Sequence, residues 1–393
     1  MPDNHGVVFH RICAPDLTES FFLFGARGTG KTTLLREILK AEDCLWIDLL
    51  RARDEDIYSR DPEILIQQIL KQNPDWVVVD EVQKLPKLLD IIHFVIESPT
   101  RAKFALTGSS ARKLKLGAAD LLAGRAFLNI LSPITFLEAG KEFCLNTALG
   151  FGTLPKVFQL KSDTSRASYL RSYAQTYLKE EIWSEQIVRR LEPFRRFLAV
   201  AAQMNGKLIN QAKIAQDVGV DPKTVSQYFQ ILEDTHLGFM LEGFDHSLRK
   251  RLGKTPKFFF FDIGVARALA GHLRIQVVES TSQFGELFEQ LVVLEMYRLN
   301  HYFALDLEFS HLRTKDNAEI DLVIKRPGKS TVLCEIKSTR HVDSSDLNFM
   351  RTIASDLGEP AVCYCLCREE RSRLLKDVHV MPWMEGIREI VGA

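Results

Sequence analysis

A glycine-rich segment near the N-terminus has the residue types needed to bind the phosphates of a nucleotide. It fills the fixed positions of a phosphate-binding loop with the run Gly25-Ala26-Arg27-Gly28-Thr29-Gly30-Lys31-Thr32-Thr33. Glycines let backbone N–H groups face phosphate oxygens, Lys31 adds a positive charge, and Thr32 offers a hydroxyl to Mg²⁺. An apolar run, Phe21–Phe24, precedes the segment and a helical pattern follows it. The sequence therefore predicts a strand, loop and helix that bind ATP with Mg²⁺.

A second segment supplies the acids that such a site needs. The run from Trp76 to Val79 is continuously apolar and leads into Asp80 and Glu81. A run of this kind predicts a strand buried on both faces, as in a parallel sheet covered by helices. We expect Asp80 to hold the metal and Glu81 to polarise the water that attacks the γ-phosphate. The alternative for Glu81 is a surface glutamate at a strand end.

Two further positions complete the predicted nucleotide site. The apolar segment that begins at Lys103 ends in small polar residues, among them Thr107 and Ser109, which can contact the γ-phosphate or its water. Arg125 precedes the strand-like run from Ala126 to Leu131, and we expect it at the same edge of the sheet. There it would stabilise transition-state charge, in its own subunit or in a neighbour within a homo-oligomer. The alternative is an ordinary surface arginine.

These segments resemble those of prokaryotic AAA+-type ATPases with a C-terminal DUF4143 region. The resemblance also rests on the runs Asp80–Pro86 and Leu131–Glu138, and it extends over nearly the whole chain. It implies that Lys31 and Thr32 contact the phosphates and that Asp80 and Glu81 are the Walker B acids. It further implies a sensor among Thr107 and Ser109, and an arginine finger at Arg125.

Length and composition indicate a protein of several domains. The chain has 393 residues, of which 46% are hydrophobic, and its 51 basic residues balance 51 acidic ones. The apolar stretches are too short to span a membrane, and the N-terminus lacks a signal-peptide core, so we expect a cytoplasmic protein without membrane contact. Cys363, Cys365 and Cys367 alternate along a strand-like run, which predicts buried thiols rather than a metal site.

The middle of the chain has the pattern of a helix-turn-helix. Two helical segments, Gln211–Val218 and Asp221–Leu232, flank the turn Gly219-Val220, and Asp221 is placed to cap the second helix. The residues expected to contact DNA are on this second helix and on the basic loop that follows it: Lys223, Thr224, Gln227, Arg249, Lys250 and Arg251. The alternative is a winged helix that serves as a lid or binds proteins.

The C-terminal part contains a second group of chemically suitable residues. A hairpin is expected from the strand-like runs Ala318–Ile324 and Thr331–Lys337, which would bring Asp321 close to Glu335. Two carboxylates there could hold Mg²⁺ or Mn²⁺, and Lys337 could activate a water or offset phosphate charge. The alternative is a solvated hairpin face.

This arrangement resembles the PD-(D/E)XK nuclease superfamily. The resemblance implies Glu289 as the helix acid, Asp321 and Glu335 as metal ligands, and Lys337 as the catalytic lysine. Ile320 stands where that superfamily usually has a proline. A nuclease-like fold that binds without cleaving is the alternative.

The sequence thus predicts an α/β protein built from several units. We expect a P-loop, AAA+-like parallel-sheet domain over residues 1–140, a helical connector over 141–190, a winged-helix domain over 191–270, and a restriction-endonuclease-like α/β domain over 271–393. The predicted function is an ATPase that couples its nucleotide state to DNA binding and metal-dependent DNA cleavage. The alternative is an ATP-dependent regulatory switch for protein interactions, with a C-terminal domain that does not cleave.

Overall fold

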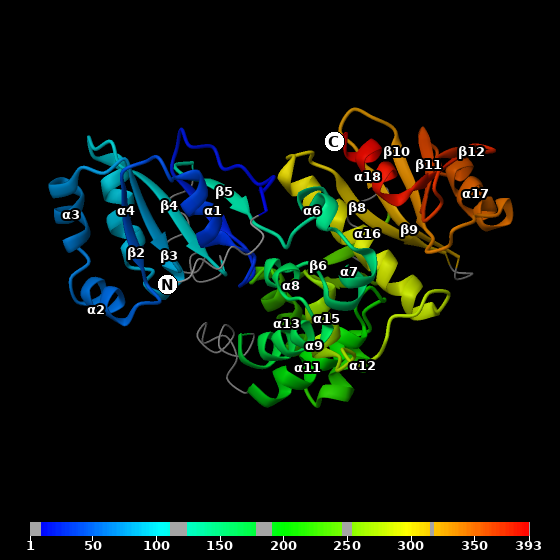
Figure 1. Ribbon diagram of the computed structural model, residues 1–393. Helices are drawn as coiled ribbons and strands as arrows, with labels where there is room; N and C mark the ends of the chain where they lie inside the picture. The colour runs from blue at the N-terminus through cyan, green and yellow to red at the C-terminus, as the bar shows by residue number, and fades with distance from the viewer. Residues whose placement is uncertain (1–8, 111–123, 178–190, 246–253, 315–317, 393) are drawn as a thin grey trace.

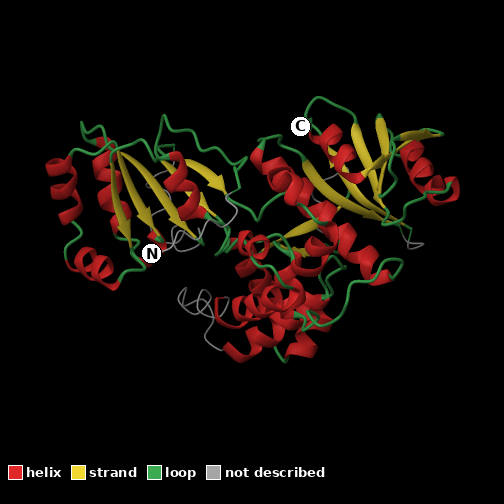
Figure 2. Cartoon of the chain, in the orientation of Figure 1, coloured by secondary structure: helices red, strands yellow, loops and turns green. Residues whose placement is uncertain are grey.

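The chain folds into two sheets with a helical region between and below them (Figures 1 and 2). This computed structural model describes residues 9–110, 124–177, 191–245, 254–314 and 318–392. The expected DNA contacts Arg249, Lys250 and Arg251 lie outside the described residues. Among the described residues, no helix is both long and apolar enough to cross a membrane.

The N-terminal sheet is parallel, with strand order β2-β3-β4-β1-β5. Its strands are β1 (Phe21–Phe24), β2 (Cys44–Asp48), β3 (Trp76–Asp80), β4 (Lys103–Gly108) and β5 (Phe127–Ile130). All side chains of β3 are buried, as its continuous apolar run predicts. Because the strands are parallel, the residues that follow β1, β3 and β4 meet at one edge of the sheet.

Helices cover both faces of this sheet. They are α1 (Lys31–Ile38), α2 (Ala52–Arg60), α3 (Ile64–Gln72) and α4 (Leu88–Glu97), and the short η1 (Val82–Lys84) follows β3. Leu34 and Leu35 of α1 pack on one face with Phe21 and Leu23, whereas α3 and α4 pack on the other face. The strand-loop-helix arrangement expected around the phosphate-binding loop is confirmed, because the loop joins β1 directly to α1.

The central region is helical and includes a two-stranded hairpin before its last helix. Its helices are α6 (Phe136–Ala139), η3 (Gly140–Glu142), α7 (Leu145–Phe151), α8 (Pro155–Gln159), α9 (Asp163–Ser172), η4 (Tyr173–Tyr177), α11 (Leu191–Gln203), α12 (Gln211–Val218), α13 (Pro222–Asp234) and α15 (Ile263–Leu269). The expected cap of α13 is confirmed, since Asp221 accepts a hydrogen bond from the Thr224 N–H at 2.9 Å. Val225, Phe229 and Leu232 are buried, as their helical spacing predicts.

The second sheet is mixed, with strand order β12-β13-β11-β10-β9-β8-β6-β7. Its strands are β6 (Gly238–Gly243), β7 (Lys257–Phe260), β8 (Glu308–Arg313), β9 (Glu319–Lys325), β10 (Thr331–Ile336), β11 (Ala361–Cys367), β12 (Arg373–Leu375) and β13 (Val378–Pro382). The hairpin β6–β7, which the sequence assigns to the winged-helix domain, also forms the edge of this sheet because β6 pairs with β8.

Helices also cover both faces of the second sheet. The long α16 (Ser282–Tyr302) and α18 (Trp383–Val391) pack on one face, and α17 (Asn348–Asp356), preceded by η5 (Ser344–Leu347), packs on the other. Cys363, Cys365 and Cys367 are buried in the core beneath α17, so the expectation of buried thiols is confirmed. The helix predicted around Glu289 is α16, which lies against one face of the second sheet (Figure 1).

A buried ion pair on α16 joins three segments of the chain. Arg298 donates to Glu295 at 3.1 Å, to the Thr153 hydroxyl at 3.0 Å, and to the Phe261 carbonyl at 2.9 Å. Glu295 also accepts from the Phe136 N–H at 3.0 Å. Burial raises the pKa of Glu295 to about 7, although the Arg298 charge opposes that rise.

The pKa of Glu295 predicts a loss of stability as the pH rises. The raised value means that the folded state holds this proton more tightly, so the stabilisation is complete below the usual pKa of 4.5 and is lost as the pH passes through about 7. Glu295→Gln keeps a neutral hydrogen-bonding side chain. It should flatten the pH dependence of the unfolding free energy between these values, by at most about 1.4 kcal/mol per pH unit.

Urea denaturation of both proteins at several pH values measures this difference. Glu308→Gln, which changes an exposed glutamate on β8, is the matched control and should leave the slope as in the wild type. An unchanged slope in Glu295→Gln would assign the pH dependence to other buried groups.

Candidate functional site

The phosphate-binding loop turns sharply at its first glycine. Gly25 has φ +153°, and a Cβ at this position would lie 2.2 Å from the Leu131 carbonyl oxygen. A side chain there would collide with the backbone, so the close approach of the segment after β5 requires glycine. The Leu131 N–H donates to the Phe24 carbonyl at 2.7 Å, which keeps that segment against β1.

Lys31 begins α1, and its side chain returns to the loop. Its ammonium donates to the Gly25 carbonyl at 2.7 Å and to the Ala26 carbonyl at 3.3 Å. The Thr29 hydroxyl donates to the same Ala26 carbonyl at 2.9 Å. Lysine and loop therefore form one compact unit at the carboxyl end of β1, where the N-terminus of α1 favours anions.

Asp80 connects the loop to the neighbouring strands. The Thr32 hydroxyl donates to one oxygen of Asp80 at 2.7 Å, and the Thr107 hydroxyl donates to the other. A hydroxyl and a carboxylate so placed are hard oxygen ligands of the kind that Mg²⁺ prefers. The residue types and their placement fit a magnesium ion held by Thr32 and Asp80.

Glu81 lies beside Asp80 in an unusual backbone conformation. Its φ of 61° is in the left-handed region, which costs of the order of 1 kcal/mol or more for a residue other than glycine. The Glu81 N–H donates to the Thr107 hydroxyl at 3.2 Å, and its carboxylate accepts from the Gln83 amide. The same amide donates to the Ser109 hydroxyl at 3.1 Å. The structure thus brings together Asp80, Glu81, Thr107 and Ser109, as the sequence predicts.

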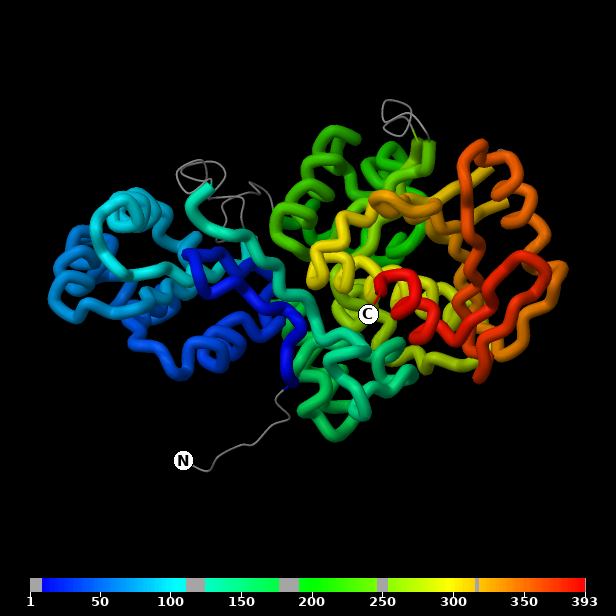
Figure 3. The backbone as a smooth tube through the Cα atoms, turned by 90° about the horizontal axis from the view of Figure 1, so that it is seen from above, coloured from blue at the N-terminus to red at the C-terminus, as the bar shows by residue number. Residues whose placement is uncertain are grey.

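Sequence reasoning missed two residues of this site. Gln83 holds the Glu81 carboxylate, and its only sequence signal is its place in the run that follows Asp80. Arg11 has no such signal, yet it is buried and donates to the Thr29 carbonyl of the loop at 2.8 Å. It also donates to Glu138 at 2.9 Å and to the Tyr302 hydroxyl at 3.0 Å, so it links the loop to α6 and α16. Figure 3 shows the N-terminal segment beside the chain that leaves β5.

Central helices pack against the phosphate-binding loop. The Tyr173 hydroxyl donates to the Arg27 carbonyl at 2.7 Å, and the Tyr169 hydroxyl lies 3.3 Å from where a Cβ of Gly28 would be. A cavity of about 130 Å³ is lined by Gly25 and Ala26 of the loop, by Glu233 of α13 and by Tyr297 of α16. The loop therefore contacts the helical region through Tyr173, and a cavity lies between other parts of the two.

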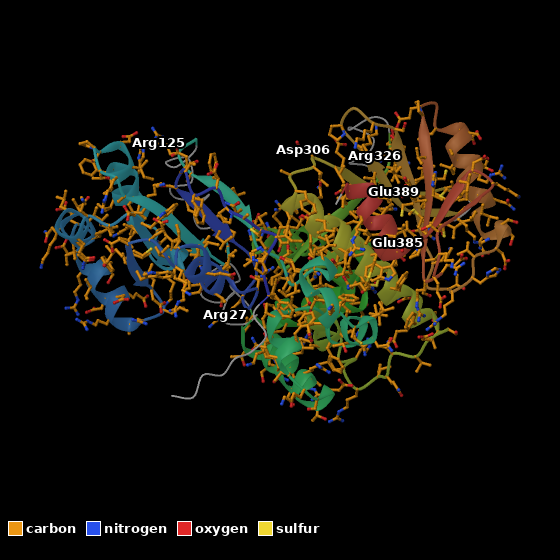
Figure 4. The ribbon with its side chains drawn as sticks, turned by 45° about the horizontal axis from the view of Figure 1, so that its top comes forward. Arg27, Arg125, Asp306, Arg326, Glu385 and Glu389 are labelled. Carbon is orange, nitrogen blue, oxygen red and sulfur yellow. The ribbon has the colours of Figure 1, made fainter. Side chains whose placement is uncertain are left out.

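Arg125 does not lie at the phosphate edge of its own subunit. It precedes β5, which runs parallel to β1, whereas Gly25 follows β1, so the two residues are at opposite ends of the strands. Arg27 and Arg125 are both labelled in Figure 4. Arg125 donates to Glu97, at the end of α4, at 2.7 Å. The expected position of Arg125 at the phosphate edge is therefore wrong, because the strand that follows it is parallel to β1 rather than antiparallel. A role for Arg125 across a subunit interface stays a prediction.

The C-terminal carboxylates form a second site at the junction of α16, β9 and β10. β9 and β10 are antiparallel neighbours, as predicted, and Asp321 accepts from the Ile336 N–H at 2.7 Å. Burial, together with the nearby Glu289 and Glu335, raises the pKa of Asp321 well above its usual range. Glu335 pairs with Lys337 at 2.6 Å. Burial raises the pKa of Glu335, while Lys337 opposes that rise.

A lysine that sequence reasoning missed enters this site from the hairpin. Lys257, the first residue of β7, is 5% exposed and donates to Glu289 at 2.8 Å. Its ammonium also lies 2.6 Å from a carboxylate oxygen of Glu319. Burial lowers the pKa of Lys257, but the two carboxylates outweigh burial and raise it overall. The burial of Lys257 could not be predicted from the sequence, because this lysine is the last cation of a basic run that is typical of a solvated loop.

The acids of the second site fit a divalent cation in chemistry but are paired differently. Carboxylate oxygens are suitable ligands for Mg²⁺ or Mn²⁺, and the Glu335 Oε2 atom is buried and has no hydrogen-bond partner among the described residues. In the part of the chain that the structure describes, however, no three Asp, Glu, His or Cys side chains converge as a metal site. Glu289 and Glu335 instead contact the two lysines.

The exposed side of α13 carries the polar residues expected to contact DNA. Lys223, Ser226, Gln227 and Gln230 are exposed, while Thr224 is half-buried and donates its hydroxyl to Asp221 at 2.6 Å. The Thr224 hydroxyl is therefore used in capping the helix, which leaves Lys223 and Gln227 as the described candidates for contacts from this face.

Comparisons with protein families divide the chain into three parts. Residues 18–140 match the model of an AAA domain, residues 144–275 match a domain of unknown function, DUF8612, and residues 284–385 match another, DUF4143. The chain joins an AAA domain to a DUF4143 domain. The resemblance to AAA+-type ATPases with a C-terminal DUF4143 region is thus confirmed, and the nuclease-like interpretation of the DUF4143 domain stays a prediction.

Relatives from distant prokaryotes match most of the chain. An uncharacterised protein of Mycobacterium tuberculosis is 26% identical over 92% of this chain and 79% of its own length. An uncharacterised protein of Methanocaldococcus jannaschii is 23% identical over 87% of this chain and 80% of its own length.

Solved structures resemble this chain only weakly. The ORC2 protein of Aeropyrum pernix, in complexes with ADPNP and ADP, is 14% identical with a TM-score of 0.28, over 66% of this chain and 90% of that one. A DNA replication initiation factor is 13% identical with a TM-score of 0.24, over 52% and 65% of the two chains. At such TM-scores the matches carry no argument about the function of this chain.

The geometry of the AAA domain predicts two different defects at the phosphate site. Lys31→Ala should weaken ATP binding, because the ammonium would contact phosphates that are already present in the ground state. Glu81→Gln should retain ATP and slow its hydrolysis by about 10²- to 10⁴-fold, since the carboxylate would act on the attacking water. Fluorescent-nucleotide titration and a phosphate-release assay measure the two properties.

Glu42→Gln is the matched control, because it makes the same change at an exposed glutamate before β2, at the opposite edge of the sheet. It should bind and hydrolyse ATP as the wild type does. If Lys31→Ala and Glu81→Gln lost ATP affinity equally, the separate roles of the two residues would be wrong.

Proposed function

We propose that this chain is a Mg²⁺-dependent ATPase whose nucleotide state controls the engagement of DNA by its central and C-terminal regions. The observation that carries the proposal is the contact between the Thr32 hydroxyl and Asp80 at 2.7 Å, directly beside the phosphate-binding loop. These two groups come from separate segments, and their meeting forms the usual pair of protein ligands for a nucleotide-bound Mg²⁺.

The roles of the remaining residues follow from their positions. Bound Mg²⁺ would neutralise the charge that develops on the phosphates during transfer. Lys31 would bind the same phosphates at the N-terminus of α1, where the helix dipole adds to its charge. Glu81 would orient and polarise the attacking water, with Gln83 and Thr107 fixing its carboxylate and its backbone.

DNA binding is assigned to the winged-helix-like unit in the centre of the chain. Helices α11 to α13 are followed by the hairpin β6–β7, which is the element order of a winged helix. The exposed Lys223 and Gln227 support α13 as the contacting helix. The basic residues Arg249, Lys250 and Arg251 belong to the connection between the two hairpin strands, where a wing would meet phosphates.

Charge reversal on α13 tests this assignment. Lys223→Glu should weaken binding to duplex DNA and lower the logarithmic salt slope by about 0.9 for the lost phosphate contact. Lys213→Glu makes the same charge change on the exposed side of α12 and is the matched control. Fluorescence anisotropy across a range of salt concentrations measures both. Equal salt slopes in the two variants would count against α13 as the contacting helix.

Metal-dependent cleavage of DNA is assigned to the acidic site of the DUF4143 domain. Asp321 and Glu335 would hold the metal, with Glu289 beside them, and Lys337 would activate water or offset phosphate charge. The support is the pairing of β9 with β10, which places Asp321 next to the strand of Glu335 and Lys337.

Metal binding and cleavage should separate in variants of this site. Asp321→Ala removes a charged oxygen ligand and should lower Mn²⁺ affinity, whereas Lys337→Ala should retain Mn²⁺ and lose cleavage. Calorimetric titration with MnCl₂ without nucleotide, beside a plasmid-nicking assay, measures the two properties. Glu370→Ala, an exposed carboxylate after β11, is the control and should keep both. Wild-type protein that neither binds Mn²⁺ nor nicks DNA would exclude the nuclease assignment.

A second candidate function is a regulatory switch that binds without cleaving. The observation that favours it is the pairing of Glu289 with Lys257 and of Glu335 with Lys337, which leaves these carboxylates on ammonium groups rather than around a metal. DNA-stimulated ATP hydrolysis would support the first function. Stimulation by proteins or peptides, with no response to DNA, would support the second.

A further inference from the structure

The acidic site contains more carboxylates than ammonium groups. Its carboxylates are Glu289, Glu319, Asp321 and Glu335, and its ammonium groups are Lys257 and Lys337. When all are ionised, the carboxylates exceed the lysines by two charges, which is the charge of one divalent cation. Glu335 is 9% exposed, and its Oε2 atom has no hydrogen-bond partner among the described residues, so one ligand atom is already free for a cation.

Lys257 occupies the part of the site that a metal would need. Its ammonium lies between Glu289 and Glu319, at 2.8 Å and 2.6 Å from their oxygens. A divalent cation bound to Glu289 would share that carboxylate with the Lys257 ammonium. Two cations held by one carboxylate repel each other strongly in a partly buried site. Lys337 differs, because it is the more exposed of the two lysines and, among the described residues, forms an ion pair with Glu335 only.

We propose that Lys257 is a built-in competitor of the divalent cation: its ammonium fills the place of the metal at Glu289, and metal binding requires this side chain to swing away. The inference rests on the proposed function, in which these carboxylates bind metal. It adds a residue from the hairpin to the control of that site, and it explains why the acids do not converge in the present conformation.

Backbone hydrogen bonds hold the hairpin around Lys257 in place. When a metal binds, the Lys257 side chain is therefore the part expected to move. The Ile209 N–H donates to the Pro256 carbonyl at 2.8 Å, and the Gly206 N–H donates to the Phe258 carbonyl at 2.7 Å. Phe258 is fully buried and packs against Phe229 of α13, with ring centroids 4.9 Å apart. A lysine stem of four methylene groups can leave Glu289 by rotation about its own bonds while β7 stays in place.

Removing the competing charge should strengthen metal binding. We expect Lys257→Met, titrated with MnCl₂ by calorimetry without nucleotide, to bind Mn²⁺ about tenfold or more tightly than the wild type, as for the loss of one close charge contact. Mn²⁺ should also raise the melting temperature of the variant more than that of the wild type. Lys254→Met, a half-exposed lysine of the same hairpin, is the matched control and should bind Mn²⁺ as the wild type does.

A second variant keeps the test valid if Lys257→Met is unstable. Lys257→Met with Glu319→Gln removes one of the two carboxylates left unpaired and keeps Glu289 for the metal; it should show the same gain in affinity. Equal Mn²⁺ affinity in wild type and variants, or weaker binding in the variants, would overturn the role of Lys257 and leave the metal site intact. No Mn²⁺ binding by any of these proteins would overturn both this role and the proposed metal site.

Discussion

The buried pair of Glu295 and Arg298 on α16 is the interaction on which the domain arrangement depends. Removing two charges from water costs several kcal/mol per ion, and hydrogen bonds from other segments offset that cost, although the Arg298 Nε atom is buried without a partner among the described residues. Here the partners are the Phe136 N–H, the Thr153 hydroxyl and the Phe261 carbonyl, each from a different segment. The charges can be satisfied only when α6, the central helices and the hairpin all lie against α16, so folding of this interior fixes their positions together.

The same helix physically links the two candidate sites. Tyr302, near the end of α16, accepts from Arg11, which in turn holds the Thr29 carbonyl of the phosphate-binding loop. Glu289 lies thirteen residues earlier on α16, about 20 Å away at roughly 1.5 Å per residue, and pairs with Lys257 in the acidic site. A change in the loop that alters the Arg11 contacts therefore acts on the C-terminal end of a helix whose N-terminal half carries a carboxylate of the second site.

The parts of the structure that could be predicted from the sequence depend on neighbouring residues. The loop around Lys31 and the cap at Asp221 are set by short-range spacing, and the buried strand at Asp80 by local composition. Arg11 and Lys257 could not be found in this way, because Arg11 contacts Thr29 and Glu138, 18 and 127 residues away, and Lys257 contacts Glu289, 32 residues away. The edge at which Arg125 lies depended on the direction of β5, and strand direction is decided by tertiary pairing rather than by the residues of the strand.

The pairing of β6 with β8 gives the acidic site its composite character. Lys257 belongs to the region that matches DUF8612, whereas Glu289, Asp321 and Glu335 belong to the region that matches DUF4143. Because the hairpin is the edge of the same sheet, an ammonium from one region reaches carboxylates of the other. The family boundary therefore separates two parts of a single ionic cluster, and a DUF4143 domain without the hairpin would leave Glu289 and Glu319 without their buried cation. The charge balance of the second site is thus a property of the whole chain.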